Sequence, residues 1–249
     1  RSFNLWKFPG APDFFKWVRI FSPYPAVDFI HTFNYIPITG RPWLVSHESY
    51  LPRFVGRSLD QKKAWRWGLE KLASEKCRGI LPISLAARRM FLEQAEEHGF
   101  PNHLFENKIS VIYPAVPASS LKVKKDVDHQ RGPVRILFVG GDFFRKGGRA
   151  LLNAFSILRK HYQVVLTIVS TIPVGDNITR PTEAVRNRTI SEISSNAAIT
   201  WYQKITNSDL LGHIFPSADI FVLPTLGDTF GFVNIEAMAC GLPVVSSRL

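Results

Sequence analysis

Short apolar runs and segments with helical spacing alternate along most of the chain. In the second half, the apolar runs predict strands at 134–142, 163–170, 198–202, 219–223 and 243–247. Helices are predicted between these strands, at 149–162, 182–194, 208–216 and 232–240. Strands and helices that alternate at this spacing are typical of parallel sheets with right-handed crossovers. The pattern therefore predicts an α/β fold.

The first half of the chain repeats this alternation. The predicted strands lie at 27–33, 43–47, 79–84 and 108–113, and the predicted helices at 60–75 and 85–97. Ser84 can act as the N-cap of the second helix. Between the halves, the stretch 117–133 is polar, charged and bounded by prolines, which is typical of an interdomain linker. We therefore expect two domains, at residues 1–125 and 126–249.

The segment 218–247 combines a buried strand, a glycine-containing loop and a helix with two carboxylates. Pro224 ends the strand, and Asp228 and Glu236 follow with seven residues between them. A loop at the end of a buried strand is where α/β proteins hold ligands. The N–H groups at the start of a helix favour negative charge. We expect a phosphate-bearing ligand here, with the carboxylates accepting hydrogen bonds from its hydroxyls.

This acid–glutamate pair and the sequence AMACGLPVV after it resemble the family-4 retaining glycosyltransferases of GT-B fold. The resemblance implies that Glu236 binds the ribose of a nucleotide and that Asp228 binds hydroxyls of the donor sugar. Where the family usually has Glu-Gly-Phe-Gly, this chain has Asp228, Thr229, Phe230 and Gly231. The resemblance places these residues in the donor site, with a shorter acid and one additional side chain.

A second glycine-containing loop follows the predicted strand 134–142. Arg145 and Lys146 stand there, just before two glycines that open a helix, and this combination predicts an anion site. By resemblance, Lys146 is the family's lysine on the donor diphosphate. Gly141 stands where the family's arginine is usual, so Arg145 is a candidate for the second cation. The alternative for both residues is a solvated basic helix cap.

The first half also resembles the family. Its strand 43–47 ends in His47, and the resemblance implies a position near the donor sugar, where the histidine could orient a hydroxyl or stabilise charge. The alternative is a structural histidine with satisfied hydrogen bonds. The resemblance implies a GT-B fold, with two Rossmann-like doubly wound parallel-sheet domains that face a cleft. It also implies a first strand and closing helices that we do not find, so we expect a chain truncated at both ends.

Composition limits the classes of partner. The chain has 249 residues, 45% of them hydrophobic, a net charge of +11 and a pI of about 9.9. Such a charge favours anionic partners, here a nucleotide diphosphate or an anionic membrane surface. Nucleic acid is disfavoured because no nucleic-acid motif is present and the basic residues are dispersed. Cys77 and Cys240 do not form a spaced framework, which is typical of a reducing, cytoplasmic setting.

Aromatic and basic residues interleave in the stretch 6–19 and again in 62–67. One interpretation is that these stretches dock on an anionic membrane, at its inner face, to reach a lipid-linked acceptor. The other is a basic solvated face with the aromatic rings turned inward, which we favour because compositional signals of this kind are weak.

Taken with the resemblance, these features predict a retaining glycosyltransferase. It would move a hexosyl unit from a UDP- or GDP-sugar to an acceptor hydroxyl in glycan or glycolipid assembly, without a metal or a permanent cofactor. Lys146, Arg145 and the N–H groups after Gly231 would stabilise the leaving diphosphate. Two alternatives remain. One is a noncatalytic nucleotide-sugar-binding module, and the other is a dinucleotide-dependent oxidoreductase, although the chain lacks G-x-G-x-x-G in its first glycine loop.

Overall fold

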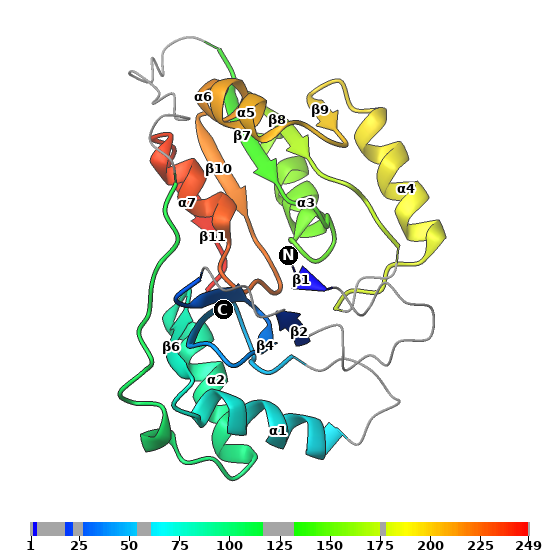
Figure 1. The fold of residues 1–249 in the computed structure, drawn as a ribbon. Helices are drawn as coiled ribbons and strands as arrows, with labels where there is room; N and C mark the ends of the chain where they lie inside the picture. The colour runs from blue at the N-terminus through cyan, green and yellow to red at the C-terminus, as the bar shows by residue number, and fades with distance from the viewer. Residues whose placement is uncertain are drawn as a thin grey trace. The chain divides into compact units, whose positions relative to one another are not determined.

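The computed structural model describes residues 2–3, 18–21, 27–53, 61–116, 132–174 and 178–248. By its internal contacts the chain divides into two compact units, Arg1–Pro114 and Ala115–Leu249, and each is described by itself (Figure 1). The boundary predicted between residues 125 and 126 falls in the stretch 117–131, which lies outside the described residues.

The C-terminal unit is built on a five-stranded sheet in which every pair of neighbouring strands is parallel. The strands, in their spatial order, are β11 (Val244–Ser246), β10 (Ile220–Leu223), β7 (Val134–Val139), β8 (Val164–Val169) and β9 (Ile199–Tyr202). The chain runs outward from β7 through β8 to β9, and then returns to place β10 on the other side of β7. The direction of strand progression therefore reverses between β7 and β10, and such switch points are where open α/β sheets bind ligands.

The helices of this unit connect the strands as the sequence predicts. They are α3 (Gly148–Leu158), α4 (Glu183–Ser194) and α7 (Phe232–Ala239), and α7 lies beside β10 and β11 in Figure 1. The predicted helix 208–216 is present as a continuous helical run whose middle is π-helical. It consists of α5 (Asn207–Asp209), the π-helical turn η5 (Leu210–Ile214) and α6 (Phe215–Ser217). Pro216 accounts for the π-helical turn, because it lacks an N–H and its ring crowds the carbonyl four residues earlier.

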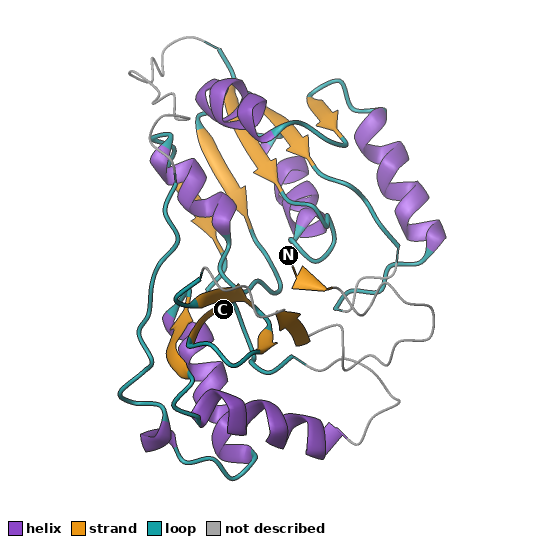
Figure 2. Cartoon of the chain, in the orientation of Figure 1, coloured by secondary structure: helices purple, strands orange, loops and turns teal. Residues whose placement is uncertain are grey.

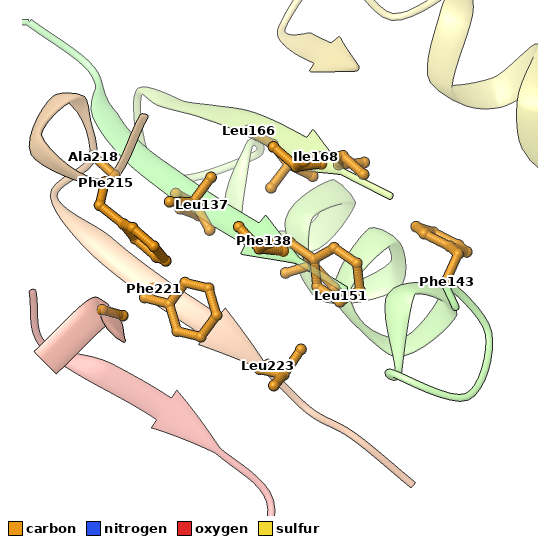
Figure 3. Close-up of a cluster of buried hydrophobic side chains, with 14 of the residues drawn as sticks. Leu137, Phe138, Phe143, Leu151, Leu166, Ile168, Phe215, Ala218, Phe221 and Leu223 are labelled. Carbon is orange, nitrogen blue, oxygen red and sulfur yellow. The ribbon is translucent and has the colours of Figure 1, made fainter. Parts of the chain in front are cut away.

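The core of the C-terminal unit lies on both faces of β7 and β10. The last four residues of β7 are all buried, as expected for a central parallel strand covered on both sides. Figure 3 shows Phe138 of β7 and Phe221 and Leu223 of β10 among the packed side chains. The rings of Phe215 and Phe221 pack with centroids 5.8 Å apart. This packing holds the ends of β7 and β10 in place, from which the two glycine-containing loops emerge.

The described residues of the N-terminal unit form two smaller sheets (Figure 2). One is parallel and contains β3 (Ile30–Phe33), β5 (Trp43–His47) and β6 (Cys77–Pro82). The other contains β1 (Ser2–Phe3), β2 (Val18–Phe21) and β4 (Ile36–Ile38). The helical segments are α1 (Gln61–Ala73), α2 (Leu85–Glu97) and the 3₁₀ turn η3 (Asn102–Leu104). The predicted N-cap is confirmed, because Ser84 Oγ accepts a hydrogen bond of 2.9 Å from Ala87 N–H.

One prediction in this unit was wrong, and the strands β1, β2 and β4 were not predicted. The stretch 108–113 was predicted as a strand, but it forms an isolated bridge between Ile109 and Ile80. The stretch runs along β6 and is joined to it by separate hydrogen bonds, such as the bond of 2.7 Å from Ile80 N–H to Lys108 C=O. It does not form a regular ladder with β6. The strand β4 was not predicted, because Pro37 at its centre argues against a strand in a sequence pattern.

Candidate functional site

Two loops leave the carboxyl ends of the neighbouring strands β7 and β10. The first loop, residues 140–147, leads into α3, and the second, residues 224–231, leads into α7. Because the two strands are parallel and adjacent, both loops emerge at the same edge of the sheet. They flank the switch point, where open α/β sheets bind ligands, so the region between them is the candidate ligand site.

The two loops touch through their backbones. Gly147 has a φ of 82°, and a β-carbon on it would lie 1.9 Å from the carbonyl oxygen of Pro224. Only glycine fits such an approach, since any side chain would overlap the second loop. Nearby, Leu226 N–H donates a hydrogen bond of 2.9 Å to Arg145 C=O. The first turn of α3 is therefore held directly against the end of β10.

Lys146 and Asp228 form an ion pair across the two loops. Lys146 Nζ donates to Asp228 Oδ2, and the side chains are only 12% and 19% exposed. The other carboxylate oxygen, Asp228 Oδ1, accepts a hydrogen bond of 2.9 Å from Thr229 N–H. The structure thus brings together two residues that were predicted separately, from motifs 82 positions apart in the sequence. A cation and an acid meet at the switch point.

Arg145 also connects the loops, through its guanidinium group. Its Nε donates to Asp142 Oδ2 at 3.0 Å, and its Nη1 donates to Gly227 C=O at 2.8 Å. Thr225 Oγ1 donates to the same carbonyl at 3.1 Å. Sequence reasoning missed Asp142 and Thr225. The acid three residues before Arg145 was a signal that the arginine has a partner in its own loop.

The helix α7 begins at this edge of the sheet. Gly231 is its N-cap residue with a φ of 71°, and no described side chain caps the helix start. A β-carbon on Gly231 would lie 3.5 Å from Asp228 Oδ2. The uncapped N–H groups therefore begin beside the ion pair, and they carry the positive end of the helix dipole. The rings of Phe230 and Phe232 pack at 5.0 Å next to this helix start.

Glu236 lies in the second turn of the same helix. Its side chain is half-buried, and desolvation raises the pKa of its carboxyl group above the ordinary value. Burial raises the pKa of the Cys240 thiol, and the nearby carboxyl group of Glu236 raises it further. Because α7 starts beside Asp228, Glu236 lies on the helix that begins next to the Lys146–Asp228 ion pair.

His47 stands at the end of β5 in the N-terminal unit and is fully buried. Its Nδ1 lies 2.6 Å from Ser49 C=O, and because a carbonyl only accepts, Nδ1 carries the proton. Burial lowers the pKa of His47 to about 4, so the ring is neutral near pH 7. Its Nε2 is then an acceptor, and it has no hydrogen-bond partner among the described residues. A ring in this state accepts hydrogen bonds through Nε2, and the role of His47 in orienting a hydroxyl stays a prediction.

Two further observations concern metals and membranes. Among the described residues, no group of three or more His, Cys, Asp or Glu side chains is placed to hold a metal ion. None of the described helices is both long enough and apolar enough to cross a membrane. The stretch 6–17 of the basic aromatic segment lies outside the described residues, as do the side chains at 18–19. In α1, Trp65 stacks on His98 at 4.8 Å while Lys62 and Arg66 are exposed.

Comparison with known proteins identifies the C-terminal unit. Residues 133–249 match the family model described as Glycosyl transferases group 1. This part of the chain belongs to the group 1 glycosyl transferases. The match covers both loops and α7, and therefore all the predicted site residues of this unit.

Curated relatives extend the similarity into the first half of the chain. The alpha-maltose-1-phosphate synthase of Mycobacterium tuberculosis is 30% identical over 186 residues, which cover 72% of this chain and 46% of that protein. The D-inositol 3-phosphate glycosyltransferase of Pseudarthrobacter chlorophenolicus is 29% identical over 136 residues, 53% of this chain and 31% of that protein. The chain thus spans less than half the length of these relatives.

Solved structures confirm the predicted fold class of the chain. The trehalose-6-phosphate protein of E. coli, solved with UDP-2-fluoro glucose bound, matches with a TM-score of 0.60 at 13% identity. The match covers 88% of this chain and 57% of that one. At this identity the likeness concerns the fold alone. It supports the GT-B fold class, with parallel sheets in Rossmann-like units.

Proposed function

We propose that this chain is part of a retaining glycosyltransferase that moves a hexosyl unit from a nucleotide sugar to an acceptor hydroxyl. The observation that carries the proposal is the Lys146–Asp228 ion pair at the switch point, beside the uncapped start of α7. Group 1 membership favours a transferase over a dinucleotide-dependent oxidoreductase. One named relative is an alpha-maltose-1-phosphate synthase and another is a D-inositol 3-phosphate glycosyltransferase. The E. coli structure holds UDP-2-fluoro glucose, which supports a UDP-sugar as donor.

In this proposal each side chain of the C-terminal site takes one part of the donor. Lys146 and the N–H groups at the start of α7 hold the diphosphate, because both offer fixed positive charge. Glu236 accepts hydrogen bonds from the ribose hydroxyls. Asp228 accepts hydrogen bonds from the hydroxyls of the sugar, and Thr229 and Phe230 line the same loop. Arg145 remains a candidate for the second cation, although both of its donor positions described above are engaged by protein groups.

The proposed catalysis is electrostatic. Cleavage of the bond between the sugar and the diphosphate leaves negative charge on the phosphate, and preorganised donors lower the barrier where that charge develops. Lys146 is nearly buried, so its ammonium acts in a medium of lower dielectric than water. Retention is part of the proposal because the chain resembles retaining enzymes. The two acids are not assigned as a glycosidase pair, since Glu236 is reserved for the ribose.

For the acceptor we propose a carbohydrate hydroxyl, and in a finer form a lipid-linked one reached at an anionic membrane surface. The exposed basic residues of α1, such as Lys62 and Arg66, support the finer form. The two cysteines support a cytoplasmic setting, which corresponds to the inner face of that membrane. Cys77 and Cys240 are both free and buried, as is usual where thiols stay reduced.

A thermal-shift and calorimetric panel of UDP-, GDP- and ADP-sugars against the chain tests the proposal. We expect one nucleotide class to bind, and Glu236→Ala to abolish that binding. Glu192→Ala, which removes the same carboxylate from the α4 surface, serves as the matched control and should leave binding unchanged. Equal affinity of the wild type and Glu236→Ala would contradict the ribose contact. Donor binding without transfer or hydrolysis would favour the noncatalytic module, which the Asp228, Thr229 and Gly141 departures keep as a second candidate.

A further inference from the structure

We propose that Asp228 makes the site selective for nucleotides that carry a sugar over the bare nucleoside diphosphate. It does so by holding Lys146 until a ligand satisfies both side chains at once. The proposal rests on the proposed function of the site and adds a specificity to it. The sugar is then recognised twice, through its own hydroxyls and through release of the lysine that its diphosphate needs.

The geometry shows that the ammonium group of Lys146 is held in an ion pair with Asp228. The stem of Lys146 crosses Gly140 so closely that a β-carbon there would lie 2.8 Å from Lys146 Cγ. The ammonium is thereby directed across to the second loop, where it pairs with Asp228 Oδ2. Asp228 is held from its other side by Thr229 N–H. Both charges are mostly shielded from water, so neither is readily solvated if its partner leaves.

A bare diphosphate therefore approaches a lysine, Lys146, that is already paired with Asp228. To bind Lys146 it must displace the carboxylate of Asp228, which is then left without its cation and next to a second anion. Leaving a shielded charge unpaired is more costly than the gain of an ordinary hydrogen bond. A nucleotide sugar avoids this cost. Its sugar hydroxyls donate hydrogen bonds to Asp228 at the same time as its phosphates bind Lys146.

The rest of the loop contact can stay in place during this exchange. Arg145 ties Asp142 to Gly227 C=O, and Gly147 stays against Pro224, so the backbones of the two loops remain joined. The exchange requires only rotation of two side chains. It also follows that once the sugar has been transferred, Asp228 can recapture Lys146 and so favour departure of the remaining diphosphate.

Calorimetry with UDP and UDP-glucose, and with GDP and GDP-mannose, tests the proposal on wild type and Asp228→Asn. In the nucleotide class that binds, we expect Asp228→Asn to tighten the bare diphosphate by about three- to tenfold, because the lysine is released. The sugar nucleotide should gain nothing or bind more weakly. The affinity ratio between the two ligands should therefore collapse. Unchanged or weaker binding of the bare diphosphate by Asp228→Asn would overturn the proposal.

Glu192→Gln is the matched control, because it removes one negative charge from another ion pair of the same unit, with Arg149, outside both loops. We expect it to change the affinity ratio by less than about twofold, with thermal melts reporting whether it still folds. An equal tightening by Glu192→Gln would show a general charge effect and would also overturn the proposal. In a Lys146→Met background, Asp228→Asn should no longer tighten the diphosphate. If the wild type binds neither ligand of either pair, the proposed function itself fails, and this proposal fails with it.

Discussion

Both units of this chain place residues predicted for the site at the carboxyl end of a parallel strand or in the loop beyond it, but the surroundings of these residues differ. In the C-terminal unit, Lys146 and Asp228 are charged, paired across two loops and partly accessible. In the N-terminal unit, His47 is neutral, fully buried and packed against Phe91 with ring centroids 5.6 Å apart. The position of a residue at a strand end is therefore a weaker guide to chemistry than the topology around it.

The difference follows from strand order. The switch point between β7 and β10 leaves two loops side by side at one edge, so their polar groups converge where no further strand covers them. The described parallel sheet of the N-terminal unit has three strands in the order β3, β5 and β6, which progresses in one direction. There, His47 lies on the central strand β5, between the neighbouring strands β3 and β6. The predictions below test whether charge and topology separate the two units in this way.

Removal of the Lys146 ammonium should give the largest effect. For Lys146→Ala we expect turnover of the donor to fall by about 10²–10³-fold, because a preorganised cation at the leaving group is lost. Single-turnover kinetics with a bound donor measures this separately from affinity. The control is Lys160→Ala, since Lys160 is an exposed lysine of the same unit beyond the end of α3. Comparable turnover in both variants would contradict a role for Lys146 in the chemistry.

The backbone contact between the two loops is tested by Gly147→Ala. The new β-carbon would overlap Pro224 C=O at a positive φ, so we expect the free energy of unfolding to fall by about 2–4 kcal/mol. Gly141→Ala is the matched control, because a β-carbon there meets nothing within 4 Å. Urea denaturation of both variants measures the free energy of unfolding. If both substitutions cost the same, the close approach of the loops is not a stabilising feature.

The buried histidine predicts a pH dependence of stability in the N-terminal unit. The unfolded chain protonates His47 near its ordinary pKa of 6.5, whereas the folded chain does so only near 4. Its contribution is therefore complete above pH 6.5 and is lost as the pH falls toward 4, by up to about 3 kcal/mol.

Unfolding midpoints of wild type and His47→Gln between pH 7 and 4.5 measure this contribution. The glutamine variant keeps a polar side chain but cannot titrate, so its stability should fall less steeply over that interval. Parallel curves for the two proteins would mean that the ring is not kept neutral by burial.

A smaller effect is expected from the charge on Glu236. Glu236→Gln keeps the shape of the side chain but loses the charge-assisted acceptor, so donor affinity should fall by about tenfold at neutral pH. Because desolvation raises the pKa of this carboxyl group, wild-type affinity should decline as the pH is lowered through that raised pKa. The glutamine variant should lack this decline when titrated by calorimetry. A pH-independent wild type would contradict an ionised Glu236 as the ribose contact.

Local patterns predicted most elements of the fold. The strand Trp43–His47 and the helix Leu85–Glu97 were predicted with the bounds that the structure shows, because apolar spacing and a serine N-cap act over a few residues. The π turn at Leu210–Ile214 and the isolated bridge at Ile109 were not predicted. At the π turn, the geometry of the proline overrides the local α-helix propensity. At Ile109, the short length over which the chain pairs with β6 overrides the local strand propensity.

For the candidate site, the sequence alone determined the chemistry of each loop: a lysine before two glycines, and two acids around a helix start. The roles of these residues toward a donor remain predictions. Only the tertiary structure decided that Lys146 pairs with Asp228, and that Arg145 is bound to Asp142 and to Gly227 C=O. The physical reason is distance along the chain. Residues 82 positions apart meet only because β10 pairs with β7, and that strand order is set by the packing of the whole sheet.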